Sequence, residues 1–417
     1  MITLRSLPAL ALACMVSSGS LDAQVVAYVG ATVWDATGTA AIRDATMVVE
    51  NGRITGIGTG GNVPSGAEIV MLDGKFIIPG LIDTHAHVSG LWAPEEVTGE
   101  SERIRGDLEI FAKYGVTTVN SLGDDEAVIA VRDAASPTDA RARLLVAGPV
   151  IGGNATAARA AAIANAEAGV DWLKLRVDDN LGTGPKMSWD AVQAVLDVGE
   201  ERGLRVATHL FYLEDAKRLL EMGTGMVAHS VRDTDVDEEF ITALIESGVC
   251  YVPTLTREMS TFAYAERPGF LDNDFFIEFA NASEVAKVSE SAFMEAMRQS
   301  PAAAGYRIAL GQALRNLKLL VDAGAPVTFG TDAGPTARFP GFFEDLELSL
   351  MVSAGLRPEQ ALLAATSRAA ACLGLDDVGT LEVGNWADFV VLGSSPLVDI
   401  GNTQTLEQVY VAGKPVR

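Results

Sequence analysis

Basic side chains are scarce in this sequence. Its 417 residues include 31 lysines and arginines against 55 aspartates and glutamates, a formal net charge of −24. A surface of that sign repels nucleic acid and anionic lipid, so we expect neither as a partner, and a small-molecule substrate remains. The hydrophobic share of 48% is that of an ordinary globular protein, and the length suits one large α/β domain with a smaller companion.

Long apolar runs are also missing. After the N-terminus no stretch approaches the roughly 18 apolar residues that a transmembrane helix requires. At the N-terminus, Arg5 precedes an apolar run, Leu7–Val16, and small and polar residues follow. This pattern predicts a signal peptide over residues 1–23, cleaved after Ala23, and therefore a periplasmic or secreted protein. A buried first helix is the alternative. A lipoprotein anchored through Cys14 is less favoured, because "ALAC" lies early and lacks a leucine at the usual place.

Cysteine is rare, with three in the chain. Removal of the predicted signal peptide would leave Cys250 and Cys372, each among apolar neighbours. We predict two unpaired thiols in the core rather than a disulfide. The spacing offers neither a zinc knuckle nor a redox pair.

The two ends of the chain have similar sequence patterns. Short apolar runs broken by Gly, Asn and Asp, such as "ATMVVENGRITGIG", fill residues 25–72 and predict strands and turns. "GNWADFVVLG" and "LEQVYVAGKPV" repeat the pattern near the C-terminus. We predict one small β-sandwich domain built from both ends, residues 24–76 and 378–417.

The middle of the chain alternates short apolar strands with helical patterns. Eight strands are expected: "FIIPGLIDTHAHV", "GVTTVNSLG", "RLLVAGPVI", "DWLKLRV", "RVATHLF", "MVAHSV", "CYVPTLT" and "PVTFGTD". The stretches between them, such as "WDAVQAVLDVGEERG", have apolar residues at helical spacing and are long enough for parallel crossovers. These units predict an α/β fold with a (β/α)8 TIM-like barrel over residues 77–377. A doubly wound open sheet is the competitor, but no glycine-rich phosphate fingerprint follows the first strand.

One connection in the predicted barrel is oversized. Residues 258–324 are rich in Phe, Glu and Met and predict two helices. Long excursions from a barrel face usually cover the active site. A decorative insert, or one that forms a homo-oligomer, is an equally open alternative.

Histidine is scarce too, with four in the chain, yet two fall together in "IIPGLIDTHAHVSG". His85 and His87 end the first expected barrel strand, His209 and His229 end the fifth and sixth, and Asp332 ends the eighth. The carboxyl ends of barrel strands meet at one face, where barrel enzymes carry their chemistry, so we expect these side chains to converge. Imidazole and carboxylate together favour a divalent first-row metal, with zinc the first choice.

Lys174, at the end of the fourth expected strand, differs from the others because an ammonium group is repelled by a metal ion. A buried lysine can lose its proton. The neutral amine can then capture carbon dioxide as a carbamate, whose two oxygens can bridge two metals. The alternative is a salt bridge from Lys174 to Asp178, Asp179 or Asp332.

At these residues the sequence resembles the amidohydrolase superfamily, in particular its imidazolonepropionase-like and prolidase-like branch. The likeness runs from about Ala31 to the C-terminus. "PGLIDTHAHV" resembles the first-strand signature, "GVTTV" the second strand, "DWLKL" the carbamylated-lysine strand, "THLF" and "AHSV" the single-histidine strands, and "GTDAG" the aspartate strand. "AATSRAAACLGL" and "GTLEVGNWADFVVL" resemble the closing helix and the return to a small β-domain. The set is specific, because the ligand positions appear in order on the expected strands.

The resemblance implies a binuclear metal site. Its ligands would be His85, His87 and Asp332 for one divalent ion, His209 and His229 for the other, and carbamylated Lys174 as a bridge. A hydroxide between the metals would attack an amide carbonyl, and catalytic Asp332 would take its proton and pass it to the leaving nitrogen. The implied enzyme is an exported metal-dependent amidohydrolase that cleaves an amide C–N bond in a dipeptide or N-acyl amino acid. A cyclic amide or lactone is the alternative substrate. A non-catalytic binding protein is disfavoured, because decayed members normally lose ligands.

The chain has no fifth histidine, so branches of the superfamily that bind substrate through an extra histidine are poor guides. Tyr212, Arg232 and Arg257 follow the fifth, sixth and seventh expected strands, where barrel enzymes contact their substrates. An arginine there would grip a free carboxylate on the substrate with two parallel hydrogen bonds. Each of the three could instead be structural. For Arg232 the candidate ion-pair partners are Asp233, Asp235 and Asp237.

Overall fold

The structure is a computed structural model that describes residues 25–416 of the chain. The predicted signal peptide, residues 1–23, and Cys14 lie outside that range. Within it, no helix combines the length and the apolar composition that crossing a membrane would need.

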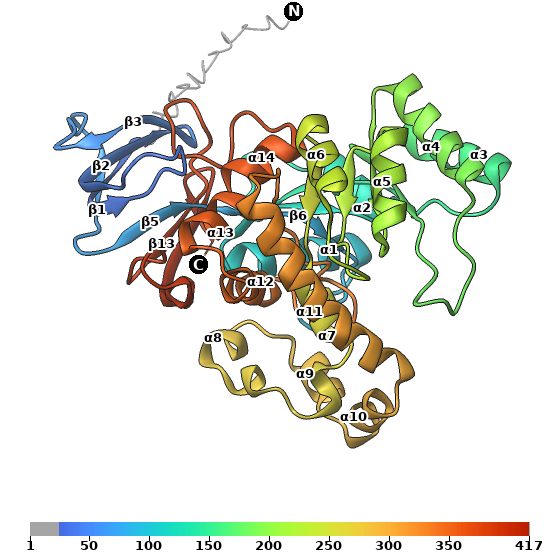
Figure 1. The fold of residues 1–417 in the computed structure, drawn as a ribbon. Helices are drawn as coiled ribbons and strands as arrows, with labels where there is room; N and C mark the ends of the chain where they lie inside the picture. The colour runs from blue at the N-terminus through green and yellow to red at the C-terminus, as the bar shows by residue number, and fades with distance from the viewer. Residues whose placement is uncertain (1–24, 417) are drawn as a thin grey trace, which may run out of the picture.

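Strands from both ends of the chain pair in one eight-stranded sheet, and Figure 1 shows the N-terminal and C-terminal strands side by side. Its order is β15-β14-β13-β5-β1-β2-β3, and β4 pairs with β1. The middle strand, β5, runs antiparallel to β13 and parallel to β1. The bounds are β1 (Val25–Val33), β2 (Ile42–Glu50), β3 (Arg53–Thr59), β4 (Glu68–Met71), β5 (Phe76–Pro79), β13 (Phe389–Leu392), β14 (Leu406–Val411) and β15 (Lys414–Pro415).

The packing of this sheet depends on aromatic rings from both ends of the sequence. Tyr28 on β1 meets Phe389 on β13 with ring centroids 4.9 Å apart, and Phe389 stacks on Tyr410 of β14 at 4.5 Å. Such pairs contribute beyond the area they bury. The N-terminal strands therefore depend on the C-terminal ones for their core.

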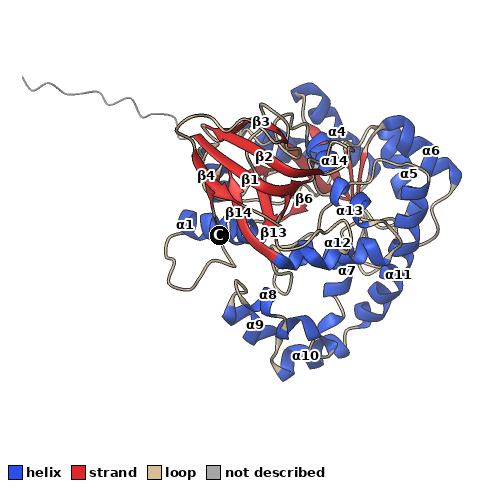
Figure 2. Cartoon of the chain, turned by 90° about the vertical axis from the view of Figure 1, so that its left-hand side faces the viewer, coloured by secondary structure: helices blue, strands red, loops and turns tan. Residues whose placement is uncertain are grey.

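Two parallel sheets form the α/β part of the chain. Figure 2 shows helices, in blue, around the strands, in red. One has the order β6-β7-β8 and the other β12-β11-β10-β9. All pairs within them are parallel. The bounds are β6 (Leu81–Ala86), β7 (Val116–Ser121), β8 (Arg143–Val146), β9 (Trp172–Arg176), β10 (Arg205–His209), β11 (Met226–Ala228) and β12 (Cys250–Val252).

Backbone contacts join the edges of these two parallel sheets. Ile151, shortly after β8, bridges Leu175 on β9 in parallel. The segment expected as the eighth strand has no ladder of its own. Instead Val327 bridges Tyr251 on β12, and the Thr84 N–H on β6 donates to the Phe329 carbonyl at 3.0 Å. This segment therefore lies extended between β12 and β6.

The stretch expected as the first barrel strand is two elements. β5 belongs to the eight-stranded sheet and β6 to a parallel sheet, and Gly80 separates them. A side chain could not replace its hydrogen, because a Cβ on Gly80 would lie 2.1 Å from Thr117 Oγ1. One continuous backbone thus passes from one sheet into the other.

Helices alternate with the parallel strands, as the periodic patterns predict. In α4, Val192, Val195 and Val198 are buried on one face. The Ser188 side chain accepts from the Ala191 N–H at the start, and Gly203 ends the helix with a left-handed φ of 68°. The bounds are α1 (Glu100–Lys113), α2 (Glu126–Asp133), α3 (Ala155–Glu167), α4 (Trp189–Arg202), α5 (Leu213–Met222), α6 (Glu238–Ser247), α12 (Phe342–Ser353), α13 (Pro358–Ala364) and α14 (Ser367–Leu373).

The oversized connection contains more helices than the predicted two, and that prediction is wrong. Its elements are α7 (Leu255–Ser260), η1 (Ala263–Ala265), η2 (Gly269–Asp272), α8 (Asp274–Ile277), α9 (Ala282–Val288), α10 (Ser291–Arg298) and α11 (Pro301–Asp322). The side chains of Asn273 and Asn281 cap the N-termini of α8 and α9, and Pro301 is the first residue of α11. Each of these residues begins a separate helix, so the segment is divided into several helices.

This helical insert packs against the loops that follow β6 and the eighth strand segment. Tyr264 Oη donates to the Ala337 carbonyl at 2.6 Å, and Asn281 Nδ2 donates to the Trp92 carbonyl at 3.2 Å. Both acceptors lie beyond the carboxyl ends of their strands. The insert therefore lies over the face on which the histidines were expected.

The prediction of two unpaired thiols is also wrong, because Cys250 and Cys372 form a disulfide with their Cα atoms 5.8 Å apart. Cys250 begins β12 and Cys372 lies in α14. They are 122 residues apart in sequence, and only the folding of α14 against the start of β12 brings them together. Their apolar neighbours gave no sign of that contact.

Candidate active site

The four histidines come together at the carboxyl ends of β6, β10 and β11, as predicted from their positions along the strands. The His85 and His229 ring centroids are 4.5 Å apart, those of His209 and His229 4.1 Å, and those of His85 and His87 5.8 Å. Such close imidazoles cannot all be charged. Burial is the main cause that lowers the pKa of His85, His209 and His229, so neutral rings with free lone pairs are favoured.

His85, His87 and Asp332 form a group whose possible ligand atoms lie within 4.8 Å of one another. His87 Nε2 is 2.7 Å from Asp332 Oδ1, and His85 Nε2 is 3.6 Å from the same oxygen. His85 and Asp332 are buried, whereas His87 is partly open. Two imidazoles and a carboxylate in this arrangement suit one divalent metal ion.

Lys174 lies beside this group. Its Nζ is buried and 3.0 Å from His85 Nε2. Burial lowers the pKa of Lys174 to about 7. Within residues 25–416, none of the three carboxylates considered as salt-bridge partners lies within 4.0 Å of it. A buried lysine with a perturbed pKa beside a cluster of possible ligands is a candidate functional residue.

The other two histidines each have one ring nitrogen occupied and one free. His209 Nε2 is 2.7 Å from Asp178 Oδ2, which leaves Nδ1. His229 Nδ1 is 2.7 Å from Thr254 Oγ1, and its buried Nε2 has no hydrogen-bond partner among the described residues. A buried polar atom without a partner is costly. A metal ion would satisfy it.

The backbone at this site is unusual. His229, Thr254 and Asp332 have positive φ angles of 131°, 47° and 60°. Such conformations cost on the order of 1–3 kcal/mol each and persist where the surroundings enforce them. They add to the reasons for placing the active site here, since strained residues cluster at functional sites.

Asp332 has two different oxygens. Oδ1 faces His87, while Oδ2 accepts from Arg338 Nη1 at 2.5 Å and lies 3.9 Å from Arg257 Nε. Burial alone would raise the pKa of Asp332, but Arg338 and His87 hold it well below its usual range. The sequence reasoning missed Arg338, although a cation six residues past a candidate catalytic aspartate was a usable signal.

The three residues predicted to contact the substrate, Tyr212, Arg232 and Arg257, lie in different surroundings. Arg232 is fully buried. Its Nε lies 2.9 Å from Glu258 Oε1, and its Nη1 donates to the carbonyl of Leu210. Among the described residues none of its three expected aspartate partners pairs with it, and Glu258 was missed.

Arg257 lies beside Asp332, with its Nε 3.9 Å from Oδ2. Its guanidinium sits over the ring of Tyr306, which comes from α11 of the insert, and Nη1 donates to both Glu258 oxygens at 3.1 Å. Tyr212 donates to Asp179 at 2.7 Å and packs beside Phe211.

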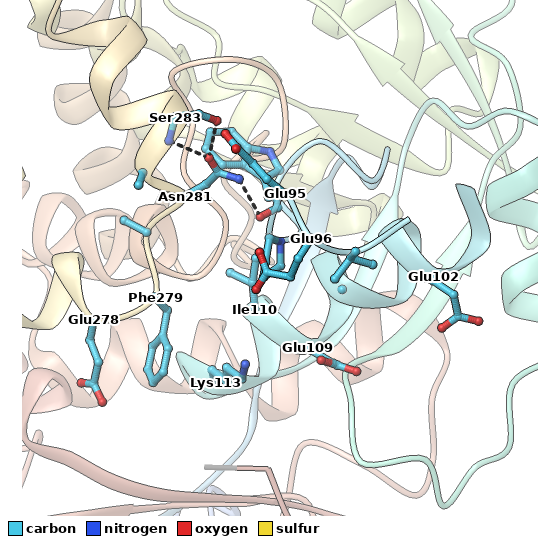
Figure 3. Close-up of a pocket in the computed structure, with 16 residues that line it drawn as sticks. Glu95, Glu96, Glu102, Glu109, Ile110, Lys113, Glu278, Phe279, Asn281 and Ser283 are labelled. Carbon is cyan, nitrogen blue, oxygen red and sulfur yellow. Dashed lines mark hydrogen bonds between the residues drawn. The ribbon is translucent and has the colours of Figure 1, made fainter. Parts of the chain in front are cut away.

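A separate surface cavity of about 630 Å³ lies between α1 and residues 278–283. Figure 3 shows that its walls carry carboxylates. These are Glu95, Glu96, Glu102, Glu109 and Glu278. None of the histidines lines it, and its charge would repel an anionic substrate. We therefore place the chemistry at the histidines.

Comparison with known proteins agrees with this geometry. A model of the Amidohydrolase family matches residues 76–416. The imidazolonepropionase of Deinococcus radiodurans is 26% identical over 403 residues, which span 89% of this chain and 92% of that protein. The imidazolonepropionase of Deinococcus deserti is also 26% identical, over 89% of this chain and 92% of that protein.

Solved structures share the fold. A Xaa-Pro dipeptidase with bound methionine in its active site has a TM-score of 0.73 and 22% identity, covering 94% of this chain and 99% of that chain. Molinate hydrolase has a TM-score of 0.73 and 22% identity, covering 94% of each chain. At such identities the likeness speaks for the fold alone. The family match, which covers most of the sequence, carries the further conclusion: the chain belongs to the amidohydrolase family, in its imidazolonepropionase-like and prolidase-like branch, and is a hydrolase acting on carbon–nitrogen bonds.

Proposed function

We propose that the protein is a metal-dependent amidohydrolase that cleaves the amide bond of a dipeptide or N-acyl amino acid. The observation that carries this is the convergence of the four histidines with Lys174 and Asp332 in one largely buried group. The free Nε2 of His229 supports metal ligation in particular, because nothing else in the described residues satisfies it.

The ligands divide into two sets. His85, His87 and Asp332 would hold one divalent ion, expected to be zinc, and His209 and His229 the other. Lys174 touches the first set through His85, and its side chain would join the two ions as a carbamate formed with carbon dioxide. Two such ions, when bound, lower the pKa of a water molecule to about 7 and polarise the substrate carbonyl.

The chain's own residues then orient the groups and move the proton. Asp178 and Thr254 hold the rings of His209 and His229, each through one ring nitrogen, so that the other nitrogen would be left for a metal ion. Asp332 would accept the proton of the attacking water and deliver it to the leaving nitrogen. Because Oδ1 faces His87, we assign the delivery to Oδ2.

The proposal also covers the domain architecture of the protein and its export. The contacts between the two parallel sheets support a closed (β/α)8 barrel over residues 77–377, and the mixed sheet supports a small β-sandwich domain from residues 24–76 and 378–417. The Cys250–Cys372 disulfide supports a periplasmic or secreted location, since disulfides persist mainly in oxidising compartments.

Metal analysis tests the central claim. Purified protein should carry about two divalent ions per chain, as two-metal sites do, and chelators should abolish hydrolysis. Dipeptides and N-acyl amino acids assayed against cyclic amides and lactones would separate the two substrate classes. Protein without bound metal, whose activity ignores chelators, would contradict the proposal.

The role of Lys174 needs its own variant. Lys174→Ala should retain less metal and lose activity, and short carboxylates with bicarbonate should restore part of both. Lys318→Ala, on the exposed face of α11, is the matched control. Full metal content and activity in Lys174→Ala would show that the lysine is structural.

A further inference from the structure

Another cavity, of about 500 Å³, lies at the opposite end of the parallel strands from the histidines. Its walls include Arg205, the first residue of β10, and Cys250, the first residue of β12. Arg205 and His209 begin and end β10, a five-residue strand, so they lie roughly 13 Å apart at about 3.3 Å per residue. A molecule bound in this cavity would therefore not occupy the site proposed for hydrolysis.

The walls of this cavity carry positive charge and no negative charge. Arg205 and Arg368 line it, and none of the other lining residues is acidic or basic. The cavity between α1 and residues 278–283 is the opposite case, because five glutamates and one lysine line it. In a protein of net charge −24, two arginines at a cavity without a carboxylate make a place where an anion is attracted.

Arg205 is held in position but keeps donors for a ligand. Its guanidinium lies over the ring of Trp172 at 4.0 Å, and its Nη1 donates to the Cys372 carbonyl at 2.5 Å. Within residues 25–416, neither Nε nor Nη2 of Arg205 makes a hydrogen bond or an ion pair. Burial lowers the pKa of Arg205 because it disfavours the charged form, and a bound anion would offset that cost.

Arg368 reaches the same cavity from α14. It precedes Ala371 and Cys372 by three and four residues, and both of these also line the cavity, so the three lie on one face of the helix. Arg368 is exposed, and its guanidinium has no hydrogen bond or ion pair among the described residues. The two guanidiniums thus come from different elements, and each has N–H donors left for the oxygens of a ligand.

The remaining walls combine neutral polar groups with apolar surface. Ser247, Thr328 and Gln360 contribute hydroxyl and amide groups, whereas Val249 and Val321 are apolar. Small-molecule sites have this composition, and a volume of about 500 Å³ lies within their usual range. The lining therefore fits an oxyanion carried on a small apolar body.

We propose that this cavity, which we name the arginine cavity, binds a small organic anion whose phosphate or carboxylate group lies between Arg205 and Arg368. A guanidinium suits either group, because its planar N–H donors match two oxygens of a carboxylate or of a phosphate. Cys250 and Cys372 line the same cavity, so the ligand would contact the junction of β12 with α14. A ligand that binds only the folded chain also raises the free energy of unfolding.

Calorimetry with three matched ligands tests the requirement for charge: phenyl phosphate, benzoate and uncharged benzyl alcohol. We expect wild type, as purified, to bind one or both anions ~10- to 100-fold more tightly than the alcohol, the range for hydrogen bonds to charged groups. Arg205→Met and Arg368→Met should each remove most of that difference, and Arg368→Glu should abolish it. Arg218→Met is the matched control, because Arg218 also lies over a tryptophan ring, at 4.3 Å from Trp189, but does not line the cavity.

Binding at the histidines has to be distinguished, because anions also bind metal ions. His229→Ala should retain the component of anion binding that the two arginine variants lose. The midpoint of thermal unfolding provides an independent readout, since the anions should raise it in wild type and Arg218→Met but not in Arg368→Met. A response to phenyl phosphate alone would assign the site to phosphate esters, and a response to benzoate alone would assign it to carboxylates. Equal affinity for all three ligands, no binding by wild type, or anion binding that survives both methionine variants would overturn the inference.

Discussion

At the scale of single residues, the site depends on which ring nitrogen each histidine leaves free. His209 is tied through Nε2 to Asp178, and His229 through Nδ1 to Thr254. Asp178 is itself held by Arg176 at 2.7 Å. These partners occupy one nitrogen of each ring, and so they decide which nitrogen is left to bind a metal ion.

Removal of Asp178 should therefore weaken the site without touching a ligand. Asp178→Ala is expected to lower metal affinity by ~10- to 100-fold, the usual effect of losing a residue that orients a metal ligand. Competitive titration with a chromophoric chelator would measure this. Asp190→Ala, on the exposed start of α4, is the control. Unchanged affinity in Asp178→Ala would mean that His209 is either held by other contacts or not a ligand.

At the scale of secondary structure, a turn-rich segment near the C-terminus is hydrogen-bonded to helix α12. Asp345 on α12 accepts from Thr403 Oγ1 at 2.5 Å and from Gln404 Nε2 at 2.7 Å, both in η3 (Ile400–Thr405). The carboxyl group is buried, and burial raises its pKa to about 6. The junction between α12 and η3 should therefore respond to pH.

The sign of that response follows from proton linkage. The folded state binds the Asp345 proton more tightly than the unfolded state, so its contribution to stability is complete below about pH 4 and is lost as pH rises through about 6. Asp345→Asn cannot ionise and should lack this loss, which is on the order of 2–3 kcal/mol. Urea unfolding at pH 4 and pH 7 would compare wild type, Asp345→Asn and the exposed control Asp376→Asn. A variant that loses as much stability as wild type over that interval would refute the linkage.

Helices and strands could be predicted where the local spacing of apolar residues determines them. Periodicity located α4 and most of the parallel strands, and strand order explains why His85, His209 and His229 meet. The strand interrupted at Gly80 was not anticipated, because the break depends on the close approach of Thr117. The predicted number of helices in the insert was too low, because asparagine side chains cap the start of new helices within a segment rich in apolar residues.

The residues that form hydrogen bonds and ion pairs across the site were harder to predict from sequence than the helices and strands. Glu258, Asp178 and Arg338 are common residue types whose neighbours come from distant parts of the sequence. Nothing in local spacing distinguishes Glu258, which pairs with Arg232, from the aspartates that follow Arg232 in the chain. The candidate ligands could be predicted because they are rare residues at strand ends, whereas the groups that hold them could not.

At the scale of the whole molecule, one covalent link closes a large loop. The Cys250–Cys372 disulfide spans 122 residues and ties the start of β12 to α14. Restricting the unfolded chain over such a loop stabilises the fold by roughly 4–5 kcal/mol in the chain-entropy description.

Reduction of the Cys250–Cys372 disulfide should remove its contribution to the stability of the fold. Wild type is expected to unfold at lower urea concentration when dithiothreitol is present, while Cys250→Ala/Cys372→Ala should unfold at one concentration in either condition. Mass spectrometry after alkylation would confirm the bond in the untreated protein. Free thiols in protein purified from an oxidising compartment would show that the two cysteines do not pair there.

The crossing at Gly80 has a consequence for how the molecule transmits force. β5 is clamped between β1 and β13 at the centre of the eight-stranded sheet, and a single residue separates it from β6, which carries His85. A displacement of β5 within that sheet would therefore reach His85, a candidate metal ligand, directly along the backbone. The strands from both ends of the chain that build the sheet thus help to fix the position of β6 through one covalent connection.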